Sequence, residues 1–252
     1  GRAVNYETAG IAVLWFFLYT YIILSSIDFG AGFLNFYSMA AGNKQAVRPV
    51  IERFLSPVWE VGNVFLIFFL FGMVGFFPKT SFYFGSAMLL PGSLAMLLFS
   101  IRGYYYSYKA YSKKDSRFLE FLYGTSGLLI PVVLAVVLTV SEGGFIEYKH
   151  QRIAMHYDRL FSSPYAWSVA LLTLAAVLYI ASMFLTYVAS RIGDDPALYL
   201  FRVYSLVWSG ILAGAVLLAF LTLRRHNPDH YERMLSLSWL FMLFLLCFLL
   251  AF

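Results

Sequence analysis

Charged side chains are scarce in this sequence of 252 residues. Asp, Glu, Lys and Arg together make up only 12% of the chain, whereas hydrophobic residues make up 61%. Ordinary soluble domains carry about twice this charged fraction, so that class of protein is excluded. The Lys and Arg residues are scattered through short polar loops, which argues against a nucleic-acid-binding surface. The composition indicates a protein that crosses a membrane several times.

Cysteine and histidine are rare as well. The single cysteine, Cys247, excludes a disulfide within the chain. The four histidines all fall in predicted loops: His150, His156, His226 and His230. A haem in a membrane bundle normally takes an axial histidine from a spanning helix. We therefore expect no haem, no other cofactor and no metal site in this chain alone.

Seven apolar segments reach the length of about 20 residues that a membrane-spanning helix needs. Ser56 and Pro57 predict that the second helix begins at Pro57. The longest polar connection, residues 141–163, is too short for a separate core. We predict an all-α fold, a polytopic transmembrane helix bundle forming one domain over residues 1–252. Its predicted spans are residues 9–34, 57–77, 82–101, 118–140, 165–189, 203–223 and 235–252.

The distribution of Lys and Arg favours an N-terminus outside the membrane. In that orientation the inner loops hold ten basic residues and the outer side holds eight. The loop between the third and fourth predicted spans carries half of the inner total. Because basic loops tend to stay on the cytoplasmic side, we predict that this loop is inside.

Two acids lie at the edges of the first two apolar segments. Asp28 is near the end of the first, and Glu60 is near the start of the second, so both should lie near the inner face. A carboxylate at membrane depth costs roughly 2.5 kcal/mol or more, so chains seldom keep one without a partner or a use. Asn63 shares the helix face of Glu60, and Arg102 follows the third segment at the same depth.

These four residues have two interpretations. In the first, Glu60, Asp28 and Asn63 transfer protons, because carboxylates in a partly dry site can exchange protons near neutral pH. Glu60 is the better relay, since it lies about one turn into its predicted helix. In the second, Arg102 forms a structural ion pair with an acid. We identify no catalytic, cofactor-binding or metal-binding residue.

Other residues suggest packing roles. Residues 104–106 are all tyrosine and Tyr108 follows, which predicts an aromatic belt at the membrane interface, with a quinone-stacking site as the alternative. Gly30 and Gly32 predict close packing between helices.

Three runs of this sequence resemble subunit II of the cytochrome bd quinol oxidases. The family's first run is Leu-acid-Gly-Phe-Asp-x-Gly-x-Gly, and residues 24–32 read Leu-Ser-Ser-Ile-Asp-Phe-Gly-Ala-Gly. Its Pro-x-Trp-Asp-x-Asn-Glu-Val-Trp-Leu run resembles residues 57–66, Pro-Val-Trp-Glu-Val-Gly-Asn-Val-Phe-Leu. Its Arg-Gly-x-x-Phe-Glu-x-Arg run resembles residues 102–109, Arg-Gly-Tyr-Tyr-Tyr-Ser-Tyr-Lys.

The resemblance implies a haem-free subunit of a terminal oxidase that oxidises quinol and reduces oxygen to water. Haem b and haem d would belong to a larger partner, subunit I, which this chain would brace while helping to admit protons from the cytoplasm. The resemblance also implies a bacterial or archaeal cell membrane, with lipid, a structural quinone and a small single-span accessory subunit as further partners.

The sequence departs from the family in two respects. Three family acids are neutral here, at Ser25, Asn63 and Ser107. The family has eight spans, whereas seven are visible, so we expect that an eighth is missing from this sequence. The departures place the chain in a divergent branch and weaken the case for a proton route made of several carboxylates.

Two other functions fit the same residues. A proton-coupled secondary transporter would use Asp28 and Glu60 as coupling sites, but it should show paired repeats of broken helices, and none is evident. In a purely structural scaffold, neutral residues could replace both acids.

Overall fold

Nearly all of the described chain is helical. The computed structural model describes residues 2–42, 44–112, 114–149 and 152–250. Five of its helices are long and apolar enough to cross a membrane, or up to seven if each of two bent pairs is one span. The predicted all-α transmembrane bundle is therefore confirmed. The helices are α1 (Arg2–Ala40), α2 (Lys44–Phe76), α3 (Pro78–Ala87), α4 (Leu89–Tyr111), α5 (Arg117–Ser141), α6 (Tyr157–Ser162), α7 (Pro164–Ile192), α8 (Asp195–His226), α9 (Pro228–Ser236) and α10 (Ser238–Leu250).

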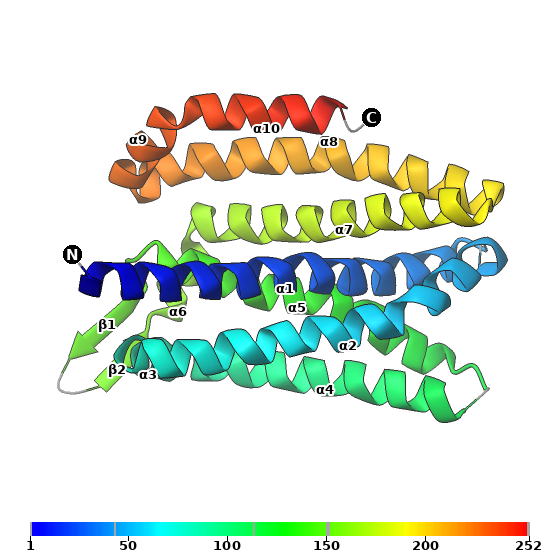
Figure 1. The fold of residues 1–252 in the computed structure, drawn as a ribbon, viewed down its shortest axis with the longest axis horizontal. Coiled ribbons are helices and arrows are strands. Elements are labelled where there is room, and N and C mark those ends of the chain that lie inside the picture. The colour runs from blue at the N-terminus through cyan, green and yellow to red at the C-terminus, as the bar shows by residue number, and fades with distance from the viewer. Residues whose placement is uncertain (1, 43, 113, 150–151, 251–252) are drawn as a thin grey trace.

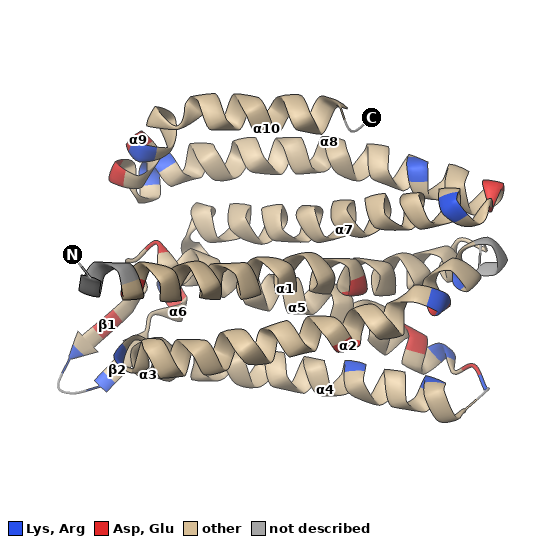
Figure 2. Cartoon of the chain, viewed as in Figure 1, with Lys and Arg blue, Asp and Glu red and all other residues tan. Residues whose placement is uncertain are grey.

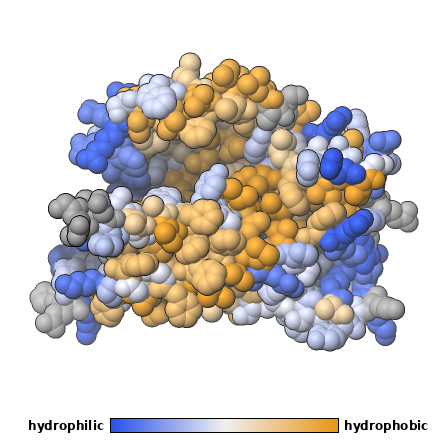
Figure 3. All heavy atoms as spheres, in the orientation of Figure 1, coloured by the Kyte–Doolittle hydropathy of each residue, from blue (hydrophilic) through white to orange (hydrophobic). Residues whose placement is uncertain are grey.

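Helix α1 occupies the centre of the bundle. It packs against α2, α5 and α7, while α4 packs against α5 and α8 packs against α7. Figure 1 shows the resulting order, with α2 and α4 on one side of α1 and with α7, α8 and α10 on the other. Figure 2 shows charged residues gathered at the two ends of the bundle, and Figure 3 shows an apolar band between these ends. This distribution is the one that a bilayer requires.

The two ends of the bundle carry different connections. At one end α1 leads into α2, α4 into α5 and α7 into α8, and we call it the α1–α2 end. The other end carries a small antiparallel hairpin, β1 (Ile146–Lys149) and β2 (Arg152–Met155), and we call it the hairpin end. The pairing runs from Ile146 with Met155 to Lys149 with Arg152. The sequence analysis did not predict this hairpin.

The predicted start of the second helix is wrong. Helix α2 begins at Lys44, so Pro49 and Pro57 both lie inside it and Pro57 is not in its first turn. Glu60 therefore lies in the middle of a long helix, away from the partial positive charge of a helix N-terminus. Elsewhere, Ser163 caps α7, because its hydroxyl accepts a hydrogen bond from the backbone N–H of Ala166 at 3.3 Å.

The third and seventh predicted spans are bent. Helices α3 and α4 meet at 84°, and α9 and α10 meet at 67°. The third predicted span, residues 82–101, therefore includes the bend at Met88. Residues 251–252 of the seventh predicted span lie outside the described residues.

Gly30 and Gly127 allow the central helices to approach closely. A Cβ atom at Gly30 would lie 2.4 Å from the Cβ of Ala181 on α7, and one at Gly127 would lie 2.3 Å from the carbonyl oxygen of Phe29 on α1. A Cβ atom added at Gly32 would lie 3.0 Å from the ring of Tyr123. The predicted packing role of Gly30 and Gly32 thus agrees with the structure.

We expect Gly30→Ala to lower the stability of the protein, because the added methyl group must force α1 and α7 apart. Overpacking of this kind costs about 1–3 kcal/mol. The measurement is thermal unfolding of the purified protein in detergent. The matched control is Gly10→Ala on the same helix, where the new Cβ would lie 3.7 Å from the ring of Phe76, an ordinary contact. Equal melting temperatures for the two variants would contradict the expectation.

Candidate functional site

A buried arginine, Arg102 on α4, holds three helices together. Its side chain is fully buried and forms an ion pair with Asp28 on α1, with 2.8 Å between Nη2 and Oδ2. Nε donates to the same oxygen at 3.1 Å, and Nη2 also donates to the carbonyl oxygen of Asp28 at 3.0 Å. On α5, Nη1 donates to the carbonyl oxygen of Tyr123 at 3.0 Å and to Oγ of Ser126 at 3.2 Å. All five N–H donors of the guanidinium can thus be satisfied.

The local sequence makes this burial possible. A Cβ atom at Gly127 would lie 3.2 Å from Nη1 of Arg102, so a larger residue there would crowd the guanidinium. The rings of Tyr123 and Phe29 lie 4.2 and 5.1 Å from the Arg102 guanidinium carbon. Aromatic faces attract cations, so these rings compensate part of the lost hydration.

The second oxygen of Asp28 is occupied by two tyrosines. Oδ1 accepts hydrogen bonds from the hydroxyl of Tyr123 at 3.0 Å and from the hydroxyl of Tyr106. The two hydroxyls lie 2.9 Å apart. Asp28 is 1% exposed, so it is a buried carboxylate with both oxygens bonded. We call Asp28, Arg102, Tyr106, Tyr123 and Ser126 the Asp28 cluster.

A second buried carboxylate, Glu120, lies closer to the α1–α2 end. Its Oε1 pairs with Nζ of Lys109 at 2.7 Å. Its Oε2 accepts hydrogen bonds from Nδ2 of Asn35 at 2.7 Å and from the hydroxyl of Tyr105 at 3.1 Å. These contacts also join α1, α4 and α5. The ring of Tyr105 stacks on that of Tyr123 with 4.0 Å between centroids, so it connects Glu120 with the Asp28 cluster.

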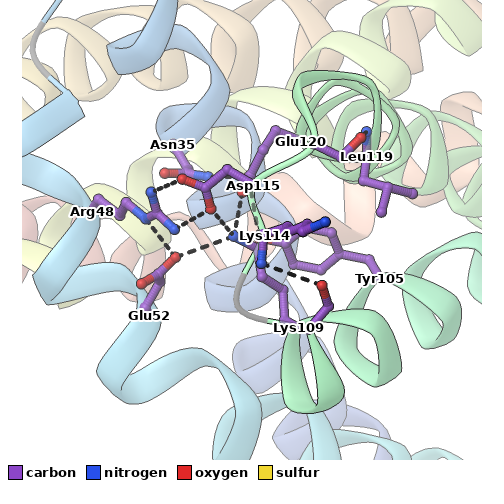
Figure 4. A network of polar contacts seen from close by, with 11 residues as sticks. Asn35, Arg48, Glu52, Tyr105, Lys109, Lys114, Asp115, Leu119 and Glu120 are labelled. Atoms are coloured by element: carbon purple, nitrogen blue, oxygen red, sulfur yellow. Dashed lines mark hydrogen bonds and ion pairs between the residues drawn. The ribbon is translucent and has the colours of Figure 1, made fainter.

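Beyond Glu120, an ion-pair network lies at the α1–α2 end (Figure 4). Arg48 contacts both oxygens of Asp115 at 2.5 Å and Oε1 of Glu52 at 2.6 Å. Lys109 contacts Asp115 at 3.2 Å and Glu52 at 3.4 Å. The hydrogen bonds from Arg48 hold the pKa of Asp115 below its ordinary value. The network borders a cavity of about 460 Å³ between α2 and α4.

A much smaller cavity borders Asp28 directly. Its volume of about 10 Å³ is close to the minimum that one water molecule needs. Tyr21, Ser25, Asp28 and Asn63 are among the residues that line it. The Tyr21 hydroxyl is buried and makes no hydrogen bond to any residue that the structure describes. The cavity is therefore polar enough to suit a water molecule.

The four residues selected from the sequence are only partly brought together. Asp28 and Arg102 are in direct contact, and Asn63 lines the small cavity beside Asp28. Glu60, one turn from Asn63, is exposed, and its carboxylate accepts a hydrogen bond from the Ser56 hydroxyl at 3.4 Å. The side chain of Glu60 is thus not buried among the helices of this chain, because it points away from the bundle interior.

The tyrosine run does not form a simple aromatic belt. Tyr104 is 61% exposed, but Tyr105 is 6% exposed and Tyr106 is half-buried against Trp59, with 4.8 Å between stacked rings. The sequence analysis thus missed Tyr105 and Tyr106 as site residues, and it missed Glu120. Their helical spacing was a usable signal: residues 102, 105, 106 and 109 lie on one face of α4.

The three described histidines lie near the hairpin end, and the prediction that the histidines fall in loops holds for His156. His156 contacts Glu147 at 2.7 Å, and His230 contacts Glu142 at 2.6 Å. His226 is the last residue of α8 and His230 lies in α9, so neither is in a loop. His150 lies outside the described residues. Among the described residues, no group of three or more His, Cys, Asp or Glu side chains could hold a metal ion.

We expect Arg102→Met to destabilise the protein by about 3–5 kcal/mol, because it leaves Asp28 buried without its cation. Arg117→Met, at an exposed position of α5, is the matched control and should unfold near the wild-type temperature. Adding Asp28→Asn to Arg102→Met should restore part of the loss by removing the unpaired charge. Thermal unfolding in detergent provides the comparison. An unchanged melting temperature for Arg102→Met would contradict the role of the ion pair.

Comparison with known proteins identifies the family. The sequence matches the family described as "Cytochrome bd terminal oxidase subunit II" over residues 6–252. A Bacillus subtilis (strain 168) protein named "Putative cytochrome bd menaquinol oxidase subunit II" is 31% identical over 233 residues, covering 91% of this chain and 66% of that protein. The chain thus spans just under two thirds of the length of this curated relative.

A solved structure agrees with this result. A chain from the structure of bd oxidase from Geobacillus thermodenitrificans is 48% identical and superposes with a TM-score of 0.82. The match covers 97% of the present chain and 74% of that chain. The sequence match, the superposition and the three motif runs lead to one conclusion. This chain belongs to the cytochrome bd terminal oxidase subunit II family.

Proposed function

We propose that this chain is the haem-free subunit II of a cytochrome bd-type quinol oxidase. Such a complex oxidises quinol and reduces oxygen to water. The observation that carries the proposal is the buried Asp28–Arg102 pair, which occupies the family's first and third motif runs in a chain that matches the family over residues 6–252. The relatives named as a menaquinol oxidase subunit and as a bd oxidase chain support the same activity.

In this proposal the haems, b and d, belong to subunit I, and the present chain braces that subunit within the cell membrane. Its N-terminus would be outside, which places the α1–α2 end at the cytoplasmic face. Wide apolar surfaces support both a lipid and a protein contact, since α2 and α4 expose residues such as Phe71, Leu90 and Leu97. A small single-span accessory subunit would be a further partner.

A structural quinone between spans is a further part of the proposal. An apolar groove of about 950 Å³ borders α7, α8 and α9–α10, and its lining includes Leu172, Leu217 and Phe241. The size and apolar character suit the long hydrocarbon tail of a quinone.

The chain would also help to admit protons to the oxygen-reducing site from the cytoplasmic face. Glu60 would collect the proton, and Asn63 with one water in the small cavity would connect it to Asp28. The structure supports the second half of this path, because Asn63, Asp28 and the unbonded hydroxyl of Tyr21 border one cavity. Glu60 is exposed in this chain, so its desolvation would come from contact with subunit I.

The transporter alternative is not favoured, since the chain belongs to a family of oxidase subunits. The scaffold alternative makes a distinct prediction, because a structural Glu60 could be neutral without loss of turnover.

We expect Glu60→Gln to slow quinol-dependent oxygen consumption about tenfold or more, which corresponds to about 1.4 kcal/mol on the barrier. The amide keeps the shape of the side chain but removes the titrating group. The rate is measured on the purified complex together with its haem content, which should not change. Glu232→Gln, an exposed position of α9 near the hairpin end, is the control. Wild-type turnover of an assembled Glu60→Gln complex would leave Glu60 with a structural role.

A further inference from the structure

The cavity at the α1–α2 end leads to the Asp28 cluster. Its volume is about 460 Å³, and Glu52, Lys109 and Asp115 are among the charged residues that line it. Glu52 and Asp115 are exposed, whereas Lys109 reaches inward to the buried Glu120 (Figure 4). Water can therefore approach the bundle interior between α2 and α4, past a mouth that carries groups of both charges.

Tyr106 is the residue that joins this cavity to Asp28. It lines the cavity, and its hydroxyl donates a hydrogen bond to Oδ1 of Asp28. Tyr123 donates to the same oxygen, but it is fully buried and does not line the cavity. The Glu60 carboxylate, by comparison, accepts a hydrogen bond from Ser56 and makes no hydrogen bond to Asp28. Tyr106 thus provides the direct connection between the α1–α2 end and Asp28.

The residue type at this position is itself informative. In the family run that resembles residues 102–109, phenylalanine stands where this chain has Tyr106, and an acid stands where it has Ser107. Ser107 is exposed, whereas Tyr106 points toward Asp28. The chain has therefore lost an acid and gained a hydroxyl one residue away, on the inward face of α4.

We propose that protons enter from the cytoplasmic water through the cavity between α2 and α4, and that the Tyr106 hydroxyl passes them to Asp28. The inference rests on the proposed function and names a second entrance for the same protons, independent of Glu60. A hydronium ion in the cavity gives its proton to Oη of Tyr106 while the hydroxyl proton of Tyr106 passes to Oδ1 of Asp28. One water molecule remains in the cavity, and Tyr106 ends as a neutral phenol.

The surroundings of Asp28 make this transfer transient. Once Asp28 is neutral, Arg102 is left as a buried cation without its partner, which is strongly unfavourable. The proton therefore does not stay on Asp28, and the small cavity that Asp28 lines together with Tyr21 and Asn63 offers it a next site. Lys109 and Glu120 face Tyr105 at the cavity wall and keep the local charge balanced.

The test is Tyr106→Phe in the intact complex. The variant removes the hydroxyl, keeps the ring against Trp59, and leaves Asp28 bonded to Arg102 and Tyr123. We expect quinol-dependent oxygen consumption to slow about tenfold with haem content retained. We also expect a larger ratio of rates in H₂O and D₂O, because proton delivery becomes the slow step. A loss of packing alone would not increase this ratio.

Tyr104→Phe is the matched control, since it removes an exposed hydroxyl from the same helix without touching the cavity or Asp28. It should keep a near-wild-type rate and isotope effect. Equal slowing in both variants would overturn the inference, because the loss would then not depend on the hydroxyl that binds Asp28. Ala110→Trp provides a second test: Ala110 is exposed and lines the cavity, so a bulky side chain there should also slow turnover.

Glu60→Gln separates the two proposals. If Glu60→Gln slows oxygen consumption while Tyr106→Phe and Ala110→Trp keep the wild-type rate, the result supports proton uptake through this chain and contradicts the second entrance. If all three variants keep the wild-type rate, proton uptake through this chain is itself wrong. Slowing of Tyr106→Phe and Ala110→Trp, with Tyr104→Phe near wild type, supports the entrance whatever the result for Glu60→Gln.

Discussion

The packing of the central helices depends on burying one guanidinium group. Arg102 is fully buried, and a charge in that position is tolerated only when its hydrogen bonds are satisfied. Asp28 accepts two of the hydrogen bonds through Oδ2 of its carboxylate and one through its backbone carbonyl, while Tyr123 and Ser126 accept the others. These acceptors come from α1 and α5, so satisfying Arg102 fixes the positions of both helices relative to α4. The close approach at Gly127 is part of the same constraint.

The second carboxylate repeats this arrangement nearer to water. Glu120 binds residues of α1 and α4 from α5, as Arg102 binds residues of α1 and α5 from α4. The stacked rings of Tyr105 and Tyr123 separate the two groups of contacts. Polar groups thus continue from the exposed Asp115 and Glu52, through Lys109 and Glu120, to Tyr105, whose ring stacks on the Tyr123 ring beside Asp28. Although the chain has few charged residues, two ion pairs with buried carboxylates, Asp28–Arg102 and Lys109–Glu120, join α1, α4 and α5.

The sequence predicted the fold better than it predicted the environment of the site. Lengths of apolar segments fix how many helices can span, and alternation of their direction placed Asp28 and Arg102 at one depth. The environment of Glu60 could not be obtained in this way, because it depends on which face of α2 turns inward. That face is set by tertiary packing: a Cβ atom added at Gly62 would lie 3.5 Å from the Cβ of Leu24 on α1. Because α2 begins at Lys44, Glu60 also does not lie one turn into its helix, as the sequence had predicted.

The positions where this chain has a neutral residue in place of a family acid agree with the proposed path for protons through neutral groups. Ser25 and Asn63 stand where the family has acids, and both line the one-water cavity beside Asp28. Three acids around such a small cavity would repel one another, and some would have to be protonated. Hydroxyl and amide groups avoid this repulsion while still orienting a water molecule. Tyr106 adds a hydroxyl bonded to Oδ1 of Asp28, so Asp28, paired with Arg102, lies among neutral hydrogen-bonding groups.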